Sequence, residues 1–303
     1  MPRRAHLLIR CALALLLPVS VLAFAVPARA ASSGRVVGAT RHDVGPAGVS
    51  APEAAIANAR TGAILWSREL NTERPMASIT KVMTALVVLR AGDLNRDIKV
   101  PSAVIAYIDK YDASSAGLHP GDWLTARELL YAMLLPSGAD AAYTLAEAYG
   151  PGLSSFVSKM NATARQLGMS HTHFSNFDGL PYPSSDSDYS TAADLIKLGR
   201  AAMDWSFFRT VVSTRTYRLS AGSGHHAYTW DNLNPLLGHY PGADGIKTGW
   251  TPAAGPCLLF ESTLGGVSLI GVELDGSGND ITGTVTAGDA ITMLNWGFGQ
   301  AGA

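Results

Sequence analysis

Residues 75–90 of this 303-residue chain are PMASITKVMTALVVLR. Apolar side chains recur there at helical spacing, Pro75 precedes the run and Gly92 follows it. Because proline before and glycine after an apolar run mark helix boundaries, the stretch predicts a helix entered at Ser78. Residues three apart lie on one helix face, about one turn apart. The Lys81 amine is therefore expected to reach the Ser78 hydroxyl.

Ser78 and Lys81 have the spacing of a nucleophile and its base. A serine hydroxyl attacks well only when a neighbour takes its proton, and an amine can do so when burial or a second cation lowers its pKa. Of the six lysines in the sequence, only Lys81 has a serine three positions earlier. The plainer interpretation is a helix-capping serine beside a solvated lysine, and only further motifs can decide between the two.

Two downstream stretches supply such motifs. Thr125 and Glu128 form a capping-box pattern ahead of an apolar run that ends near Pro136, which places Ser137 in a short loop between two helices. Lys247, followed by a threonine and a glycine, lies in a segment with strand character. Together with Ser78 and Lys81, these pieces indicate a serine acyl-transfer site.

The wider pattern of apolar runs and turn residues predicts an α+β fold. A hairpin turned at residues 60–62 opens the domain, a long helical region follows, and late strands and a closing helix complete it. One antiparallel sheet would then combine strands from both chain ends. The expected strands are residues 54–58, 63–66, 245–251, 256–262 and 267–274, and the expected helices include residues 129–135, 155–166, 191–203 and about 281–296.

The motif stretches resemble the serine-type D-alanyl-D-alanine carboxypeptidases, the low-molecular-mass penicillin-binding proteins. The matching pieces are PMASITKVMTAL at 75–86, LLPSGADAA at 134–142, THFSN and a later Gly-Leu within 172–180, and GADGIKTGWT at 242–251. The likeness covers roughly residues 53–298, and three motifs in the family's order are far more specific than any one of them. It implies a penicillin-binding/β-lactamase-like transpeptidase fold for residues 51–303.

The resemblance also implies a ping-pong reaction on peptidoglycan stem peptides that end in D-Ala-D-Ala. Ser78 would attack the carbonyl between the two D-alanines, with Lys81 as proton acceptor, and water would hydrolyse the acyl-enzyme. Ser137 would relay a proton between Lys81 and the leaving amine. β-Lactams would inhibit the enzyme by acylating it, and neither a cofactor nor a metal is implied.

Substrate binding is expected to fall to the third motif. Lys247 and the Thr248 hydroxyl can pair with the substrate's terminal carboxylate and fix the scissile bond in place. By the family pattern, the N–H groups of Ser78 and Trp250 would form the oxyanion hole.

Ala139 departs from the family pattern, in which the second motif is serine, any residue, asparagine. The asparagine amide contacts the substrate backbone, so its loss removes a hydrogen bond of about 1 kcal/mol. Asp140 follows in the next place. One alternative is therefore an impaired penicillin-binding-fold module that binds muropeptides without turnover. Ser277-Gly278-Asn279 has the literal motif but lies outside the family's order and is typical of a turn.

A class A β-lactamase is a second alternative, since such enzymes share the serine-lysine and lysine-threonine-glycine pieces. They deacylate with a glutamate between the second and third motifs. Here Glu147 is the one glutamate between Ser137 and Lys247, and it lacks the expected flanking pattern. Efficient β-lactam hydrolysis is not expected.

Residues 1–30 have the pattern of a secretory signal peptide: arginines, an apolar stretch and Ala28-Arg29-Ala30 before the predicted cleavage point. Residues 31–50, rich in Gly, Ser and Pro, are predicted to be a flexible lead-in. The protein is thus expected to be exported to the cell envelope, periplasm or exterior. The chain ends at Ala303 without a predicted C-terminal membrane anchor.

Composition excludes several other classes. The net charge is −1 with 23 basic and 24 acidic residues, so no basic patch suggests nucleic acid. Of the two cysteines, one lies in the predicted leader and Cys257 lies in a strand-like run, as a buried apolar residue would. His171, His173 and the pair at 225–226 lack a third metal ligand at a telling spacing. Residues 186–188 are expected to form a solvated turn.

Overall fold

The computed structural model describes residues 45–276 and 284–302, which belong to one compact unit. The predicted leader, most of the predicted lead-in and the Ser277-Gly278-Asn279 stretch lie outside these residues. Within the described part, the Asp289 carboxylate accepts hydrogen bonds from the backbone amides of Ser50 and Ala51. The start of the domain is therefore tied to its last helix.

A five-stranded antiparallel sheet organises the domain, in the order β2-β1-β9-β8-β7. Its strands are β1 (Glu53–Asn58), β2 (Ile64–Arg68), β7 (Ala243–Thr251), β8 (Gly255–Leu264) and β9 (Val267–Leu274). Because β1 pairs with β9, the predicted sheet built from both chain ends is confirmed. The strand that carries Lys247, β7, lies at one edge.

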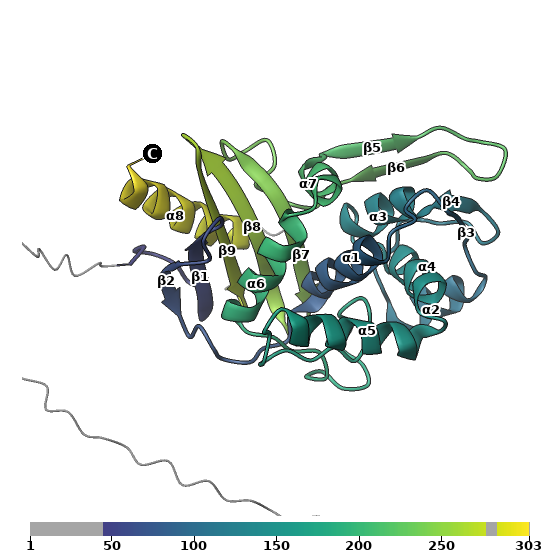
Figure 1. Cartoon of the computed structure of the whole chain (residues 1–303), viewed down its shortest axis with the longest axis horizontal. Coiled ribbons are helices and arrows are strands. Elements are labelled where there is room, and N and C mark those ends of the chain that lie inside the picture. Colours follow the sequence, from purple (N-terminus) through teal and green to yellow (C-terminus); the bar gives the residue numbers. More distant parts are fainter. Residues whose placement is uncertain (1–44, 277–283, 303) are drawn as a thin grey trace, which may run out of the picture. The chain divides into compact units, whose positions relative to one another are not determined.

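Helices cover both faces of this sheet (Figure 1). Helix α8 (Thr284–Ala301) packs against one face, and α6 (Ala192–Met203) packs against the other. Alternation along β9 separates the two cores, since Leu269 faces the α8 side and Ile270 the α6 side. The closing helix extends to Ala301, five residues beyond the predicted end.

The helical region lies beyond β7 in Figure 1 and confirms the predicted helices. Its helices are α1 (Thr80–Ala91), α2 (Ala103–Tyr111), α3 (Ala126–Leu134), α4 (Ala139–Tyr149), α5 (Leu153–Gln166) and α7 (Ser206–Ser213). The Thr125–Glu128 capping box opens α3 as expected. Two short two-stranded antiparallel sheets complete the region: β3 (Asp97–Lys99) with β4 (Trp123–Thr125), and β5 (Thr216–Leu219) with β6 (Tyr228–Asp231).

Helix α1 is buried on every side rather than amphipathic. Residues 80–89 are all buried, including Lys81 and Thr84. A helix that is apolar all round belongs in a core, and α1 packs against α3, α4, α5 and α6. A polar side chain on α1 is thus held by its surroundings, which makes this helix a rigid support for a site.

Candidate active site

Ser78 lies in η1 (Ala77–Ile79), a single turn of 3₁₀ helix that leads into α1. Lys81 Nζ lies 2.9 Å from Ser78 Oγ and donates a second hydrogen bond to the Asp178 carbonyl at 3.0 Å. Lys81 is 1% exposed, and the residue that caps α1 is Ile79. These contacts exclude the interpretation of Ser78 as a helix cap beside a solvated lysine.

Burial of Lys81 lowers the pKa of its amine to about 8, while the carboxylates of Asp178 and Asp140 act in the opposite direction. An amine with a pKa near 8 is unprotonated in an appreciable fraction of molecules at neutral pH. The pair can therefore supply a hydroxyl and a nearby proton acceptor.

Lys247 is the second buried amine of the site and is also 1% exposed. Burial and then the charge of Lys81 lower its pKa well below the ordinary value. Its Nζ donates to the Thr248 carbonyl at 2.9 Å and lies 3.5 Å from Thr248 Oγ1. The structure thus brings Lys81 and Lys247 into electrostatic contact although 166 positions separate them in the sequence.

Gly249 brings β7 close to the turn that holds Ser78. A Cβ at this position would lie 3.0 Å from the Met76 carbonyl oxygen and 3.1 Å from the Ser78 nitrogen. The next residue, Trp250, is 45% exposed. The glycine of the third motif is therefore explained by the close approach of two backbones beside the predicted nucleophile.

Ser137 occupies the loop that joins α3 to α4, in a left-handed backbone conformation with φ of 64°. Its carbonyl accepts a hydrogen bond from Ser114 Oγ at 2.6 Å. Helix α4 packs against α1, and Asp140 acts electrostatically on Lys81, so this loop borders the same site. Within the described residues, Ser137 Oγ itself makes no hydrogen bond, and none links it to Ser78 or Lys81.

Asp140 holds this loop in place instead of facing the site. Its carboxylate, 1% exposed, accepts hydrogen bonds from Ser115 Oγ at 2.6 Å and from the amides of Ala116 and Leu118 at 2.9 and 3.1 Å. Ala139 is fully buried. The position where the family pattern has asparagine therefore has no exposed surface here.

A second loop, residues 174–190 between α5 and α6, also contacts Lys81. Parts of it carry the family resemblance, but the sequence patterns assigned no role to Asp178. We name this second loop the Asp178 loop, and residues 135–138, between α3 and α4, the Ser137 loop. Thr84 Oγ1 donates to the Phe177 carbonyl at 2.6 Å, one turn along α1 from the Lys81 bond to Asp178. Asn176 is 1% exposed and donates to the carbonyls of Leu180 and Tyr182.

The expected solvated turn at residues 186–188 is wrong for Asp188. This carboxyl is 5% exposed and accepts hydrogen bonds from the Ser175 amide at 2.8 Å, from Ser175 Oγ at 2.9 Å and from the Asn176 side chain. The Asp188 carboxyl is buried because it accepts the hydrogen bonds that Ser175 and Asn176 donate.

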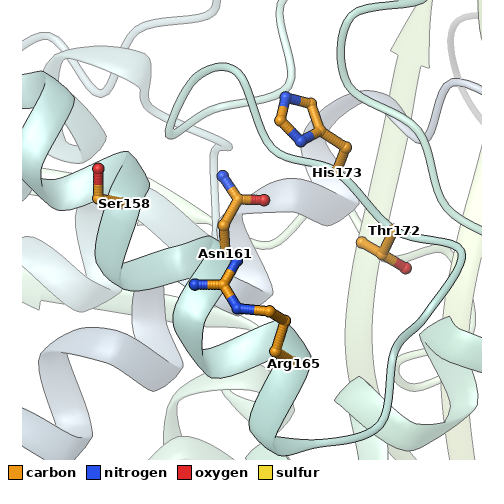
Figure 2. A pocket seen from close by; sticks show the side chains of 5 residues that line it. All are labelled: Ser158, Asn161, Arg165, Thr172 and His173. Atoms are coloured by element: carbon orange, nitrogen blue, oxygen red, sulfur yellow. The ribbon is translucent and has the colours of Figure 1, made fainter.

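Helix α5 anchors the beginning of the Asp178 loop through Asn161. Its side chain accepts from the Phe174 amide at 3.0 Å and donates to the Phe174 carbonyl at 2.7 Å. Figure 2 shows Asn161 in a polar hollow of about 320 Å³ that also has Ser158, Arg165, Thr172 and His173 on its walls. This hollow contains none of the residues predicted for catalysis or substrate binding.

The remaining predictions concern isolated polar residues. His171 Nδ1 lies 3.0 Å from Glu73, and His226 Nδ1 lies 3.0 Å from Asp122. Cys257 is buried, and burial raises the pKa of its thiol to about 12. Glu147 is exposed on α4.

Solved structures define the class to which this fold belongs. The crystal structure of the Streptomyces K15 DD-transpeptidase superposes with a TM-score of 0.76 at 39% identity, covering 83% of this chain and 98% of that one. The D-alanyl-D-alanine carboxypeptidase from Mycobacterium tuberculosis superposes with a TM-score of 0.75 at 35% identity, covering 85% and 96%. The fold is the α+β penicillin-binding fold of the DD-peptidases, as predicted.

Sequence comparisons narrow this class to a family. The family described as D-alanyl-D-alanine carboxypeptidase matches residues 40–278, and the chain belongs to this family of serine peptidases. A D-alanyl-D-alanine carboxypeptidase of Streptomyces sp. (strain K15) is 42% identical over 253 residues, 80% of this chain and 84% of the relative. One from Mycobacterium tuberculosis is 36% identical over 264 residues, 84% and 87% of the two chains. A D-alanyl-D-alanine endopeptidase of Escherichia coli is 30% identical over 240 residues, 76% and 73% of the two chains.

Proposed function

We propose that the chain is a serine D-Ala-D-Ala carboxypeptidase in which Ser78 is the nucleophile and Lys81 the base. The observation that carries the proposal is the 2.9 Å contact between Lys81 Nζ and Ser78 Oγ, made by an amine whose pKa burial lowers to about 8. Ser78 Oγ attacks the carbonyl between the two D-alanines, and its proton passes to the neutral Lys81 amine. The family membership reported above supports the same reaction.

The first half of the reaction ends when the C–N bond breaks. The leaving amine of D-alanine takes a proton that Lys81 received, with Ser137 as the relay, and an ester to Ser78 remains. Water then attacks this ester, again giving a proton to Lys81, and releases the shortened peptide and the free Ser78 hydroxyl. Bonds, protons and electrons balance without a cofactor.

Substrate recognition falls to β7 in this proposal. The ammonium form of Lys247 and the Thr248 hydroxyl attract the terminal carboxylate of the peptide. The N–H groups of Ser78 and Trp250, which the Gly249 approach brings near each other, receive the developing oxyanion. A β-lactam carries a comparable carboxylate and acyl group, so penicillins acylate Ser78.

We also propose export through residues 1–30, which have the pattern of a signal peptide, and action in the cell envelope. No helix among the described residues has the length and apolarity needed to span a bilayer. Mass spectrometry of the N-terminus of the protein secreted by a host cell tests the leader, with cleavage after Ala30 as the expected result.

Intact mass after incubation with benzylpenicillin, beside a Ser78→Ala control, tests the catalytic assignment. The expected result is an adduct of the penicillin mass that requires Ser78, together with D-alanine release from a peptide ending in D-Ala-D-Ala. A folded protein without adduct or release would contradict the proposal and favour a muropeptide-binding module. Rapid loss of the adduct with penicillin turnover would favour a β-lactamase.

A further inference from the structure

Asp178 makes two different contacts with the site, one through its backbone and one through its side chain. The residue is fully buried. Its carbonyl accepts the hydrogen bond from Lys81 Nζ at 3.0 Å. Its carboxylate accepts from the Tyr107 hydroxyl at 2.7 Å and from the Leu180 amide at 3.2 Å. The side chain that donates to this carboxylate, Tyr107, is neutral. The nearby positive charge that acts on the carboxylate is that of Lys81.

The surrounding loop fixes this residue closely. Asn176 Oδ1 accepts from the amides of Asp178 and Gly179 at 3.2 and 2.7 Å. Gly179 has a φ of 83°, and a Cβ there would lie 1.9 Å from the Ala77 carbonyl oxygen. The loop backbone therefore rests directly on the residue that precedes Ser78.

Aromatic side chains hold the Asp178 carboxylate in place. The Tyr107 hydroxyl lies 2.8 Å from the Tyr182 hydroxyl as well as 2.7 Å from Asp178 Oδ2. Tyr182 stacks on Tyr111 with ring centroids 4.4 Å apart. Tyr107 comes from α2 and Tyr182 from the Asp178 loop, so the carboxylate is oriented by two separate elements.

We infer that Asp178 is a positioning residue for Lys81: its carbonyl holds the amine beside Ser78, and its carboxylate, oriented by Tyr107, sets the pH at which that amine can accept a proton. The inference rests on the function proposed above. It adds a residue outside the three motifs to the machinery that prepares the nucleophile.

The sign of the electrostatic effect follows from the charges around Lys81. Ser78 on η1 is neutral, Lys247 on β7 is an amine whose own pKa the Lys81 charge lowers, and Asp140 on α4 and Asp178 favour the charged form of Lys81. Removing the Asp178 charge while keeping its shape therefore lowers the Lys81 pKa further. The amine would then become a base at lower pH, whereas a purely structural defect would reduce the rate equally at every pH.

The test is the rate of acylation by benzylpenicillin as a function of pH. In Asp178→Asn, the acid limb of the profile is expected to shift to lower pH by about one unit. Tyr107→Phe should shift it in the same direction by less, because loss of the hydroxyl makes the Asp178 carboxyl easier to protonate. Tyr111→Phe is the matched control in the same aromatic cluster and should leave the midpoint unchanged.

A titration without catalysis separates this inference from the proposed function. Lysine labelled with ¹³C at the ε position gives six signals, and Lys81→Gln identifies the one from Lys81. Its midpoint should lie lower in Asp178→Asn than in the wild type, even if penicillin acylates neither protein. Absence of acylation in the wild type would refute the proposed function alone.

Unchanged midpoints in both Asp178→Asn and Tyr107→Phe would overturn the inference, whatever the plateau rates. Should Asp178→Asn fail to fold, Tyr107→Phe decides the question with the same two measurements. A shift to higher pH in either variant would also contradict the assigned role.

Discussion

The Ser137 loop and the Asp178 loop both border Lys81, but different kinds of contact hold them. The Ser137 loop is four residues long and is held by few contacts. The Asp140 carboxylate accepts from residues 115–118, and the Ser137 carbonyl accepts from Ser114 Oγ. The Asp178 loop spans residues 174–190 and is fixed by a network that includes Asn176, Asp188 and tyrosines from two elements. A short loop needs few anchors, whereas a long loop needs a network because more backbone groups must be satisfied.

Of the substitutions that test these two loops, Gly179→Ala should have the largest effect on stability and acylation. Its Cβ would meet the Ala77 carbonyl oxygen at 1.9 Å, and that atom belongs to backbone that cannot move away. We expect a loss of at least about 4 kcal/mol in the free energy of unfolding and loss of penicillin acylation. Urea unfolding and adduct mass provide the measurements.

Gly168→Ala is the matched control for Gly179→Ala. Gly168 also has a positive φ, 69°, but nothing lies within 4 Å of the added Cβ. It should lose only about 1 kcal/mol and keep its acylation rate. Equal losses in the two variants would mean that backbone conformation, rather than contact with Ala77, explains Gly179.

Asp140→Ala tests the carboxylate anchor of the Ser137 loop. The change leaves the buried amides of Ala116 and Leu118, and the Ser115 hydroxyl, without their acceptor, so we expect a loss of about 3 kcal/mol in unfolding free energy and slower acylation. Asp186→Ala, at an exposed carboxylate of the Asp178 loop, should change stability by less than about 0.5 kcal/mol. If the Asp140→Ala protein is as stable as the wild type, the Ser137 loop does not need the Asp140 carboxylate to keep its conformation.

Asp188 makes the network of the Asp178 loop sensitive to pH. Burial raises the pKa of its carboxyl from 3.8 to about 7. The folded protein therefore binds this proton more tightly than the unfolded chain does, so the stabilisation is complete below about pH 4 and is lost as the pH rises towards 7. The size of the loss is on the order of 4 kcal/mol.

Asp188→Asn should remove this part of the pH dependence. Urea unfolding at several pH values between about 4 and 7.5 is the measurement, and the quantity of interest is the difference in slope between wild type and variant. If the unfolding free energies of wild type and variant change equally with pH, Asp188 does not titrate in this range. The Asp178 loop would then be no more pH-sensitive than the Ser137 loop.

Ala139→Asn should have the smallest effect. It tests whether an asparagine beside the Ser137 loop, as in the family pattern, can contact the substrate. Because Ala139 is fully buried, a larger side chain must displace its neighbours, at a cost of about 1–3 kcal/mol in unfolding free energy. Acylation should change by less than about threefold. A tenfold rise would instead indicate that the asparagine amide reaches the substrate and that this chain lacks a contact it can regain.

The two loops also differ in how visible they are in the sequence. The capping box at Thr125 and the serine after Pro136 predicted the Ser137 loop, because helix ends follow local rules. The sheet strands were predicted for a similar reason, since their apolar residues recur within a few positions. The two small sheets, α2 and α7 were not predicted. No side-chain cap marks the start of α2 or α7, the small-sheet strands have three or four residues, and all of them depend on what packs against them.

Local chemistry in the sequence was sufficient to place Ser78 and Lys81 one helical turn apart, to locate the motifs at Ser137 and Lys247, and to indicate the family. Long-range folding was needed to bury Lys81, to bring Lys247 into its field and to place the Asp178 carbonyl on its amine. The pKa of a lysine depends on desolvation and on charges from distant segments, and no spacing rule encodes those. For the same reason Asp188, expected to be solvated from its neighbours in sequence, is buried among donors from residues 175 and 176.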